Sequence, residues 1–309
     1  MLKETGTLAP VVVFAYNRPE KLDKCLNNLE KCDGAAETPL FICCDGAKGT
    51  ADREKVDRVR DIAYKHAANP VFKEVNVITQ DSNKGLAASI ITGVTQIINR
   101  FGSVIVVEDD LVVLPSFLSF LNEGLGFYKD AKEYGSISAF TYPIKELREY
   151  AGDVFATRKA ECWGWATWAD RWNNAEWENT DFGSYLKDRK ERIRFERLEA
   201  GLDRLMYLQY KGKIDSWAVR WVYYLFKKDM LTVYPSKSRV ENDGFDGSGT
   251  HCADGFGTGF NSTDTDDGSD VRWEKCGLNE TLADSYAKFP RRKLVLYIAE
   301  TIKYLMKTG

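Results

Sequence analysis

The 309-residue sequence has no excess of basic residues and no long apolar run. Its 43 Lys and Arg are outnumbered by 46 Asp and Glu, which gives a formal net charge of -3 and argues against nucleic acid as a partner. No apolar stretch reaches the roughly 20 residues of a membrane-spanning helix. The first residues, MLKETGTLAP, lack the apolar core of a signal peptide. We therefore expect neither a membrane span nor an N-terminal anchor.

Paired cysteine motifs are also absent. The seven cysteines include no C-x-x-C pair, and no histidine stands at zinc-finger spacing. Reduced thiols in a cytoplasmic protein are the resulting expectation. Apolar residues make up 44% and charged residues 29% of the chain, which is the profile of a folded globular protein.

Short apolar runs alternate with amphipathic segments over the first 110 residues. The runs expected to form strands are 11–16, 40–45, 75–79 and 104–108. One helix is expected to begin at Pro19, with Asn17 as its cap. Two more helices are expected at about 51–66 and 85–100. This alternation predicts an α/β fold with a mostly parallel sheet flanked by helices.

Polar residues follow each of these four expected strands. They are Asn17 and Arg18, Asp45, Lys84, and the run from Glu108 to Asp110. Because ligands of parallel α/β sheets bind beyond the carboxyl ends of the strands, we expect these side chains to line one cleft.

Three adjacent carboxylates, Glu108, Asp109 and Asp110, lie between two apolar runs in VIVVEDDLVV. Like charges beside a dry core need a cation or a proton. Mg²⁺ and Mn²⁺ prefer oxygen ligands and are often shared between one or two carboxylates and a substrate's phosphates. The triplet therefore indicates either a divalent-cation site or a solvated acidic loop.

The stretch VEDDLVVLPSFLSFL resembles the EDDL variant of the D-x-D motif, with its following Pro-Phe helix start, in GT-A glycosyltransferases of the N-acetylglucosaminyltransferase I type. The resemblance spans residues 9–251 and extends to VVVFAYNRPEKL, CCDG, WGWATW, DSWAVRW and SRVENDGFDGSGTH. Two departures stand out. The sequence has no membrane anchor, and Ser216 separates Asp215 from Trp217 where the family has two consecutive carboxylates.

The resemblance implies a GT-A (Rossmann-like) fold and an inverting glycosyltransferase of polysaccharide biosynthesis. The donor would be a nucleotide-sugar, favoured as UDP-linked GlcNAc or a similar hexose, and the acceptor a glycan or lipid-linked glycan. Asp110 would bind Mn²⁺ or Mg²⁺, Asp109 the ribose and Glu108 the donor sugar. The residues implied around the base and ribose are Asn17, Arg18 and Asp45.

Four further side chains have a functional and a structural interpretation each. Asp215 is the candidate general base, its pKa raised by burial, or the cap of the helix that follows. Trp165 stacks on a sugar or belongs to the core. His251 contacts metal or diphosphate, or is a loop residue without a role. Lys84 meets a phosphate or is a solvated helix-start residue.

The chain is expected to divide into a nucleotide-sugar-binding half, 1–133, an acceptor half, 134–275, and a C-terminal tail, 276–309. The acceptor half contains a charged helical segment at about 185–209 and a flexible Gly/Asp-rich stretch from Asn242 to Asp270. The tail ends in an amphipathic helix from residue 290. That helix packs on the domain or contacts the inner face of the plasma membrane.

Two other functions were weighed against glycosyl transfer. A sugar-1-phosphate nucleotidyltransferase normally has a Gly-rich loop after its first strand, and FAYNRPEKL contains no glycine. A non-enzymatic carbohydrate-binding protein would leave the carboxylates without a role. Glycosyl transfer is therefore the function that the sequence favours.

Overall fold

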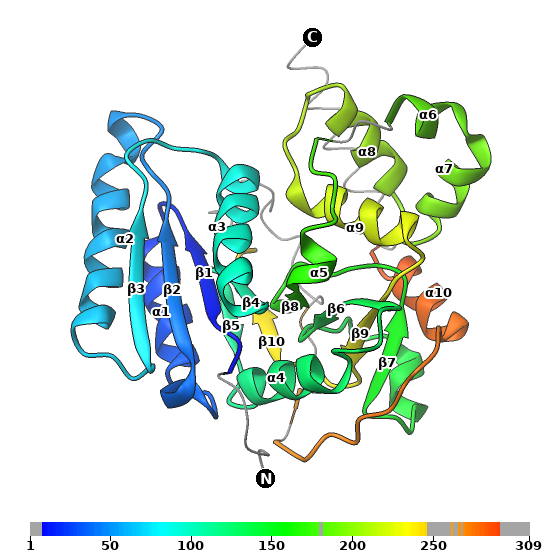
Figure 1. Ribbon diagram of the computed structural model, residues 1–309, viewed down its shortest axis with the longest axis horizontal. Coiled ribbons are helices and arrows are strands. Elements are labelled where there is room, and N and C mark those ends of the chain that lie inside the picture. The colour runs from blue at the N-terminus through cyan, green and yellow to red at the C-terminus, as the bar shows by residue number, and fades with distance from the viewer. Residues whose placement is uncertain (1–7, 179–181, 246–260, 262–264, 267, 291–309) are drawn as a thin grey trace.

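An eight-stranded sheet runs through the part of the chain that the computed structural model describes, which is residues 8–178, 182–245, 261, 265–266 and 268–290 (Figure 1). Across the sheet the order is β3 (Glu74–Thr79), β2 (Pro39–Cys44), β1 (Val11–Ala15), β4 (Ser103–Glu108), β8 (Trp165–Trp168), β6 (Tyr134–Ser138), β9 (Leu231–Pro235) and β7 (Val154–Thr157). Strands β8 and β7 run against the other six. The expected α/β fold with a mostly parallel sheet is confirmed.

Helices cover both faces of this sheet. All five residues of β1 are buried, and successive side chains of a strand point to opposite faces. Val11 and Val13 share one apolar cluster with the buried side of α1 (Pro19–Leu29), and the same cluster includes residues of α2 (Thr50–Ala68) and α4 (Phe117–Phe127). Val12 and Phe14 belong to a second cluster with α3 (Leu86–Phe101) and α9 (Trp217–Lys227). A central parallel strand is therefore apolar on both sides.

The strands and helices expected in the first 110 residues are all present. One detail is different, because α1 is not capped by Asn17. The residue at the cap position is Arg18 and no side chain caps the helix, whose first residue is Pro19. The side-chain amide of Asn17 donates instead to Asp52 in the first turn of α2 (3.3 Å).

The expected charged helix at 185–209 is three helices rather than one. They are α6 (Phe182–Lys187), α7 (Arg189–Glu196) and α8 (Leu202–Tyr210). Asp188 interrupts the first two because its carboxylate caps α7, accepting from the backbone N–H groups of Lys190 and Glu191. Gly201 separates the last two with a φ of 96°, which glycine adopts without strain.

Further elements complete the described part of the chain. They are β5 (Leu111–Val113) paired with β10 (Val240–Asn242), the short helix α5 (Ala169–Trp172), and α10 (Glu280–Lys288), together with two 3-10 turns at Ala35–Glu37 and Lys145–Glu149. The expected boundary at 133/134 falls immediately before β6, and one sheet continues across it. Residues 291–309, which include most of the predicted membrane-contacting helix, lie outside the described residues.

None of the helices in the described ranges has the length and apolar character needed to cross a bilayer.

Candidate active site

The acidic triplet lies where the chain leaves the main sheet. Strand β4 ends at Glu108, which pairs with Phe14 of β1. Asp109 and Asp110 form a turn, and the chain then enters β5, which pairs with β10 in a separate two-stranded sheet. The triplet is therefore at the carboxyl edge of the four parallel strands β3, β2, β1 and β4.

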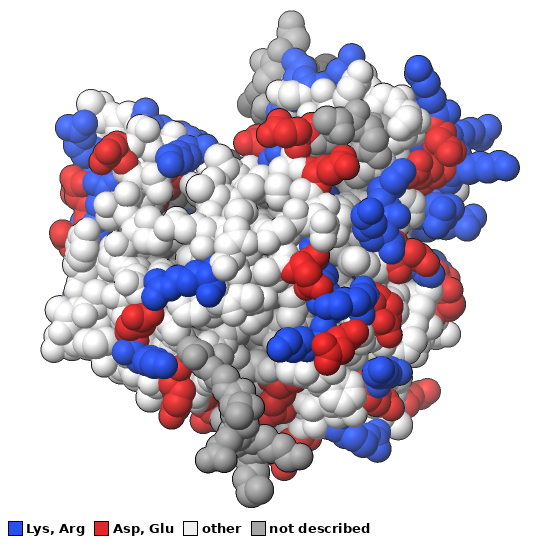
Figure 2. Space-filling model, viewed as in Figure 1, with Lys and Arg blue, Asp and Glu red and all other residues white. Residues whose placement is uncertain are grey.

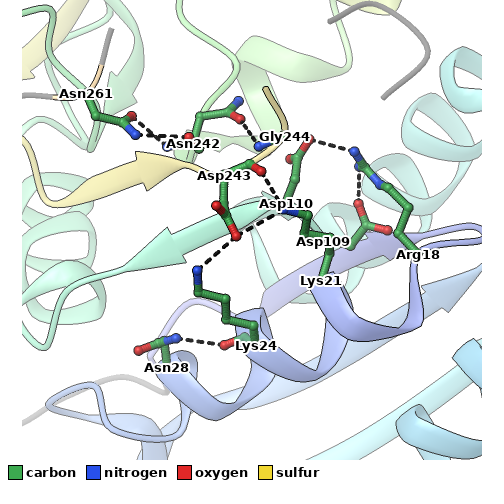
Figure 3. A network of polar contacts seen from close by, with 10 residues as sticks. All are labelled: Arg18, Lys21, Lys24, Asn28, Asp109, Asp110, Asn242, Asp243, Gly244 and Asn261. Carbon is green, nitrogen blue, oxygen red and sulfur yellow. Dashed lines mark hydrogen bonds and ion pairs between the residues drawn. The ribbon is translucent and has the colours of Figure 1, made fainter. Parts of the chain in front are cut away.

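The guanidinium of Arg18 bridges the two aspartates of this turn (Figure 3). Its Nη1 donates to Oδ2 of Asp110 at 2.9 Å, and its Nη2 donates to Oδ1 of Asp109. The side chain of Arg18 is 18% exposed and that of Asp109 only 3%. The short β1–α1 connection makes this contact possible, because it places Arg18 directly beside the end of β4.

Burial governs the protonation of Glu108 and Asp109. Removal from water raises the pKa of Asp109 to about 6, although the neighbouring Arg18 guanidinium opposes the rise. Burial also raises the pKa of Glu108 well above its usual range, and the negative charges of Asp110 and Asp109 add to that effect. At neutral pH the turn therefore holds a protonated Glu108 beside an ionised Asp109 that is paired with Arg18.

The start of the loop that follows β10 contacts Asp110 (Figure 3). The backbone N–H of Asp243 donates to the carbonyl of Asp110 at 2.8 Å. A Cβ on Gly244 would lie 2.3 Å from Oδ2 of Asp110, so only glycine leaves room for this carboxylate. Helix α1 contacts Asp243 through two lysines. Nζ of Lys24 donates to the Asp243 carboxylate at 2.8 Å, and Nζ of Lys21 donates to its carbonyl oxygen at 2.6 Å.

Sequence reasoning missed the contribution of Asp243 and Gly244. Both lie in the stretch expected to be a flexible loop, and the available signal was the Asn-Asp-Gly turn sequence from Asn242 to Gly244. Asn261 holds the base of this loop through two hydrogen bonds to the backbone of Asn242, at 2.9 and 3.0 Å. The candidate metal ligand His251 lies outside the described residues.

The carboxylate of Asp45 organises the neighbouring strand ends. Its Oδ1 accepts from the N–H groups of Gly46 (2.8 Å) and Lys84 (2.9 Å), and its Oδ2 accepts from Gly85 (3.1 Å). These bonds tie the end of β2 to the loop before α3. Asp45 also lines a pocket with the exposed Lys84, and that pocket is completed by Cys43, Cys44, Ile78, Gln80, Ser89, Thr92, Gly93 and Gln96.

Asn17 lies at the same edge, between the two groups just described. Its neighbour Tyr16 donates its hydroxyl to Asp52 at 2.8 Å and accepts from the N–H of Lys48. The structure thus brings Arg18 to the acidic turn and joins Asp45 to the backbone of Lys84. The direct ligand contacts of these residues stay predictions.

Trp165 is in the core rather than in a sugar site. Its ring is fully buried and stacks on Trp217 of α9 at 5.3 Å. It also lies 6.0 Å from the ring of Trp221. Because no part of the ring reaches solvent, Trp165 cannot stack on a bound sugar in this structure, and the predicted sugar contact is not supported. The hydrophobic effect of burying a large ring explains the preference.

Asp215 precedes α9 and is exposed, which corrects the expectation that it is buried. Its side chain is 64% exposed and accepts from Nη2 of Arg220 at 2.6 Å. The cap of α9 is Ser216, whose hydroxyl accepts from the N–H of Val219. Since the first residue of α9 stacks on Trp165, and Trp165 pairs with Val106 of β4, Asp215 lies towards the same carboxyl edge as the acidic turn.

The acidic turn offers oxygen ligands to a cation. Oδ2 of Asp109 is buried without a hydrogen-bond partner, which is costly unless a positive charge meets it. Within the described ranges, no three His, Cys, Asp or Glu side chains are close enough to hold a metal ion by themselves. The donor set fits Mg²⁺ or Mn²⁺ bound by Asp110 and completed by substrate phosphates and water.

Comparisons with known proteins give distant structural likenesses only. No family model matches the chain, and no curated protein sequence matches it. The chain is similar to the galactosyltransferase LgtC in complex with donor and acceptor sugar analogues, at 11% identity over 72% of each chain with a TM-score of 0.39. It is also similar to a candidate glucose-1-phosphate thymidylyltransferase from Bacillus anthracis in complex with sucrose, at 10% identity over 76% of this chain and 89% of the other, with a TM-score of 0.40. Likenesses this distant carry no argument for an activity.

Proposed function

We propose that this chain is an inverting GT-A glycosyltransferase that moves a hexose from a nucleoside diphosphate donor to a hydroxyl of a glycan or lipid-linked glycan. The observation that carries the proposal is the Asp109–Asp110 turn at the carboxyl edge of the sheet, where Arg18 binds one oxygen of each aspartate and Oδ2 of Asp109 is buried and unpaired. The VEDDL resemblance favours UDP and GlcNAc.

The donor is proposed to lie along the strand ends, with its base in the pocket beside Asp45 and its diphosphate at the acidic turn. A Mn²⁺ or Mg²⁺ ion bound by Asp110 would neutralise charge on the departing diphosphate. Arg18 releases Asp110 in this proposal and turns its guanidinium to a phosphate oxygen, for which the planar fork of arginine is well suited.

Glu108 is proposed to bind the donor sugar in its protonated form. Burial raises the pKa of this carboxyl group well above its usual range, so at neutral pH it has a hydrogen to donate. A hydrogen bond from the acid to a sugar oxygen avoids placing a third negative charge beside Asp109 and the diphosphate.

Asp215 is proposed as the general base. Its carboxylate is exposed and accepts a hydrogen bond from Arg220, so an acceptor hydroxyl can reach it from solvent. In an inverting transfer the base takes the proton of the acceptor hydroxyl on the side opposite the leaving diphosphate. We expect Asp215→Asn to lower turnover by about 100-fold or more while donor binding stays within a few-fold of wild type. Turnover within a few-fold of wild type would remove the assignment.

Calorimetry with UDP, with and without Mn²⁺, tests the donor and cation sites. Wild type should bind UDP with Mn²⁺, and Asp110→Asn should lose the Mn²⁺-dependent part. Asp130→Asn, an exposed aspartate in the connection after α4, is the control and should bind as wild type does. No Mn²⁺-dependent nucleotide binding by wild type would contradict the transferase proposal.

A screen of sugar nucleotides for Mn²⁺-dependent hydrolysis then identifies the donor. The same panel, incubated with diphosphate, tests the alternative of a sugar-1-phosphate nucleotidyltransferase. Release of a nucleoside triphosphate instead of a nucleoside diphosphate would favour that alternative.

A further inference from the structure

Helix α7 turns a row of basic side chains outward. Its exposed residues, with the one that follows it, are Arg189, Lys190, Ile193, Arg194 and Arg197. This spacing of i, i+1, i+4, i+5 and i+8 places all five on one face of an α-helix. Ile193 is 45% exposed and stands among four cations. We call this set the α7 face.

The acidic residues of the same segment are used within the fold. Asp188 caps α7, and Glu191 pairs with Lys227 of α9 at 3.0 Å. The carboxylate of Glu196 accepts from the N–H of Gly201 (2.8 Å) at the start of α8. These carboxylates stabilise helix ends and helix contacts, and one of them, Glu191, is neutralised by Lys227.

Most of the cations have no partner of opposite charge. Among the described residues, Lys187, Arg189, Lys190 and Arg197 form no ion pair, and Arg194 lies over an aromatic ring of α9 at 5.3 Å. An open groove beside the helix counts Lys187, Arg189 and Arg197 among its lining residues. In Figure 2 basic side chains project from the part of the molecule formed by α6 and α7.

We propose that the α7 face docks on an anionic phospholipid surface. The chain as a whole has a net charge of -3, so a long-range attraction to anions has to come from this local concentration of cations. In this proposal the cations contact lipid phosphates, and the exposed Ile193 among them enters the headgroup boundary. The α7 face has no aromatic side chain on which a nucleic-acid base could stack.

The lipid binding proposed for the α7 face does not depend on the membrane contact predicted for residues 290–309 or on the proposed activity. The test is co-sedimentation of the full chain with vesicles of phosphatidylcholine alone or with one quarter phosphatidylglycerol. We expect binding to the anionic vesicles only, weakened by salt, because screening shortens the reach of the cations.

The decisive variant is Arg189→Gln/Lys190→Gln/Arg197→Gln. Each lost cation should weaken partitioning about fivefold, or roughly a hundredfold in all. The control is Arg53→Gln/Lys55→Gln/Lys73→Gln, which removes three exposed cations from α2 and the connection to β3 and should bind as wild type does. Because all six side chains are exposed, both variants should unfold at the wild-type urea concentration.

Three results would overturn the proposal. Equal loss in the two variants would mean that net charge alone drives binding, and wild-type binding by the α7 variant would assign it to another surface. Binding of soluble polyglutamate, lost in the α7 variant, without enrichment on anionic vesicles would identify an acidic polymer as the partner instead.

Ile193→Asn should weaken binding to the anionic vesicles several-fold at high salt, where the apolar contact remains.

Discussion

Replacement of Arg18 by glutamine should make the stability of this protein strongly dependent on pH. Arg18 contacts both aspartates of the acidic turn, and Asp109 is only 3% exposed. Without the guanidinium, Asp109 has to keep a proton at pH values where the wild type has released it, because a buried carboxylate without a partner is costly.

The size of the effect follows from the pKa of Asp109. In the wild type this pKa is about 6, so near pH 5 the aspartate is protonated in both proteins and the substitution costs little, about 1 kcal/mol for the lost hydrogen bonds. Above pH 6 the variant holds a proton that the wild type has lost. Each further pH unit costs about 1.4 kcal/mol, which amounts to about 3 kcal/mol more at pH 8.

Urea unfolding at pH 5, 6.5 and 8, followed by tryptophan fluorescence, measures this difference. The gap in free energy of unfolding between wild type and Arg18→Gln should widen with pH, and Arg18→Gln/Asp109→Asn should close most of it at pH 8. Arg58→Gln breaks an exposed pair with Glu20 and should leave the free energy of unfolding close to the wild-type value at every pH.

A gap that is the same at pH 5 and pH 8 would refute this reasoning. It would mean that Arg18 acts through packing alone, or that Asp109 reaches water when the guanidinium is gone. A gap below about 1 kcal/mol at pH 8 would refute it as well.

Three other predictions concern single positions. Gly244→Ala places a methyl group against the carboxylate of Asp110 and should weaken Mn²⁺-dependent UDP binding at least tenfold by calorimetry, whereas Gly126→Ala, which meets no atom within 4 Å, should leave it unchanged. Lys159→Met leaves the buried Glu161 and the half-buried Glu199 without their cation and should cost about 3–5 kcal/mol in urea unfolding; a loss under 1 kcal/mol would contradict this. The hydrogen bond from the guanidinium of Arg192 lowers the pKa of the Asp203 carboxyl from its usual 3.8. The stability that this ion pair contributes is therefore present above about pH 4 and is lost as the pH falls. Asp203→Asn should flatten that part of the acid unfolding curve.

The sequence determined the sheet and its polar edge because the signals for both are local. Four apolar runs separated by amphipathic helices specify parallel strands through the crossover rule, and the parallel strands bring their polar ends to one edge. For this reason the sequence alone predicts that the acidic triplet, Arg18 and Asp45 lie at one edge.

Only the tertiary structure decided which partner each of these side chains has. Arg18 faces two aspartates, Asp45 faces backbone amides, and Trp165 faces other tryptophans. A local pattern does not specify these contacts, since each depends on the packing of elements far apart in the chain. Asp215 is the clearest case, because its apolar surroundings in sequence suggested burial and the fold leaves it in solvent.

The position of Asn242–Gly244 against Asp110 could not be predicted from the sequence. Its glycine is required by a carboxylate more than a hundred residues earlier, and its aspartate is held by lysines of the first helix. Local sequence determines which elements form and which residues end them, because backbone preference and periodicity act over short distances. The close approach of Gly244 to Asp110 joins residues far apart in the chain, and it exists only once the sheet has formed.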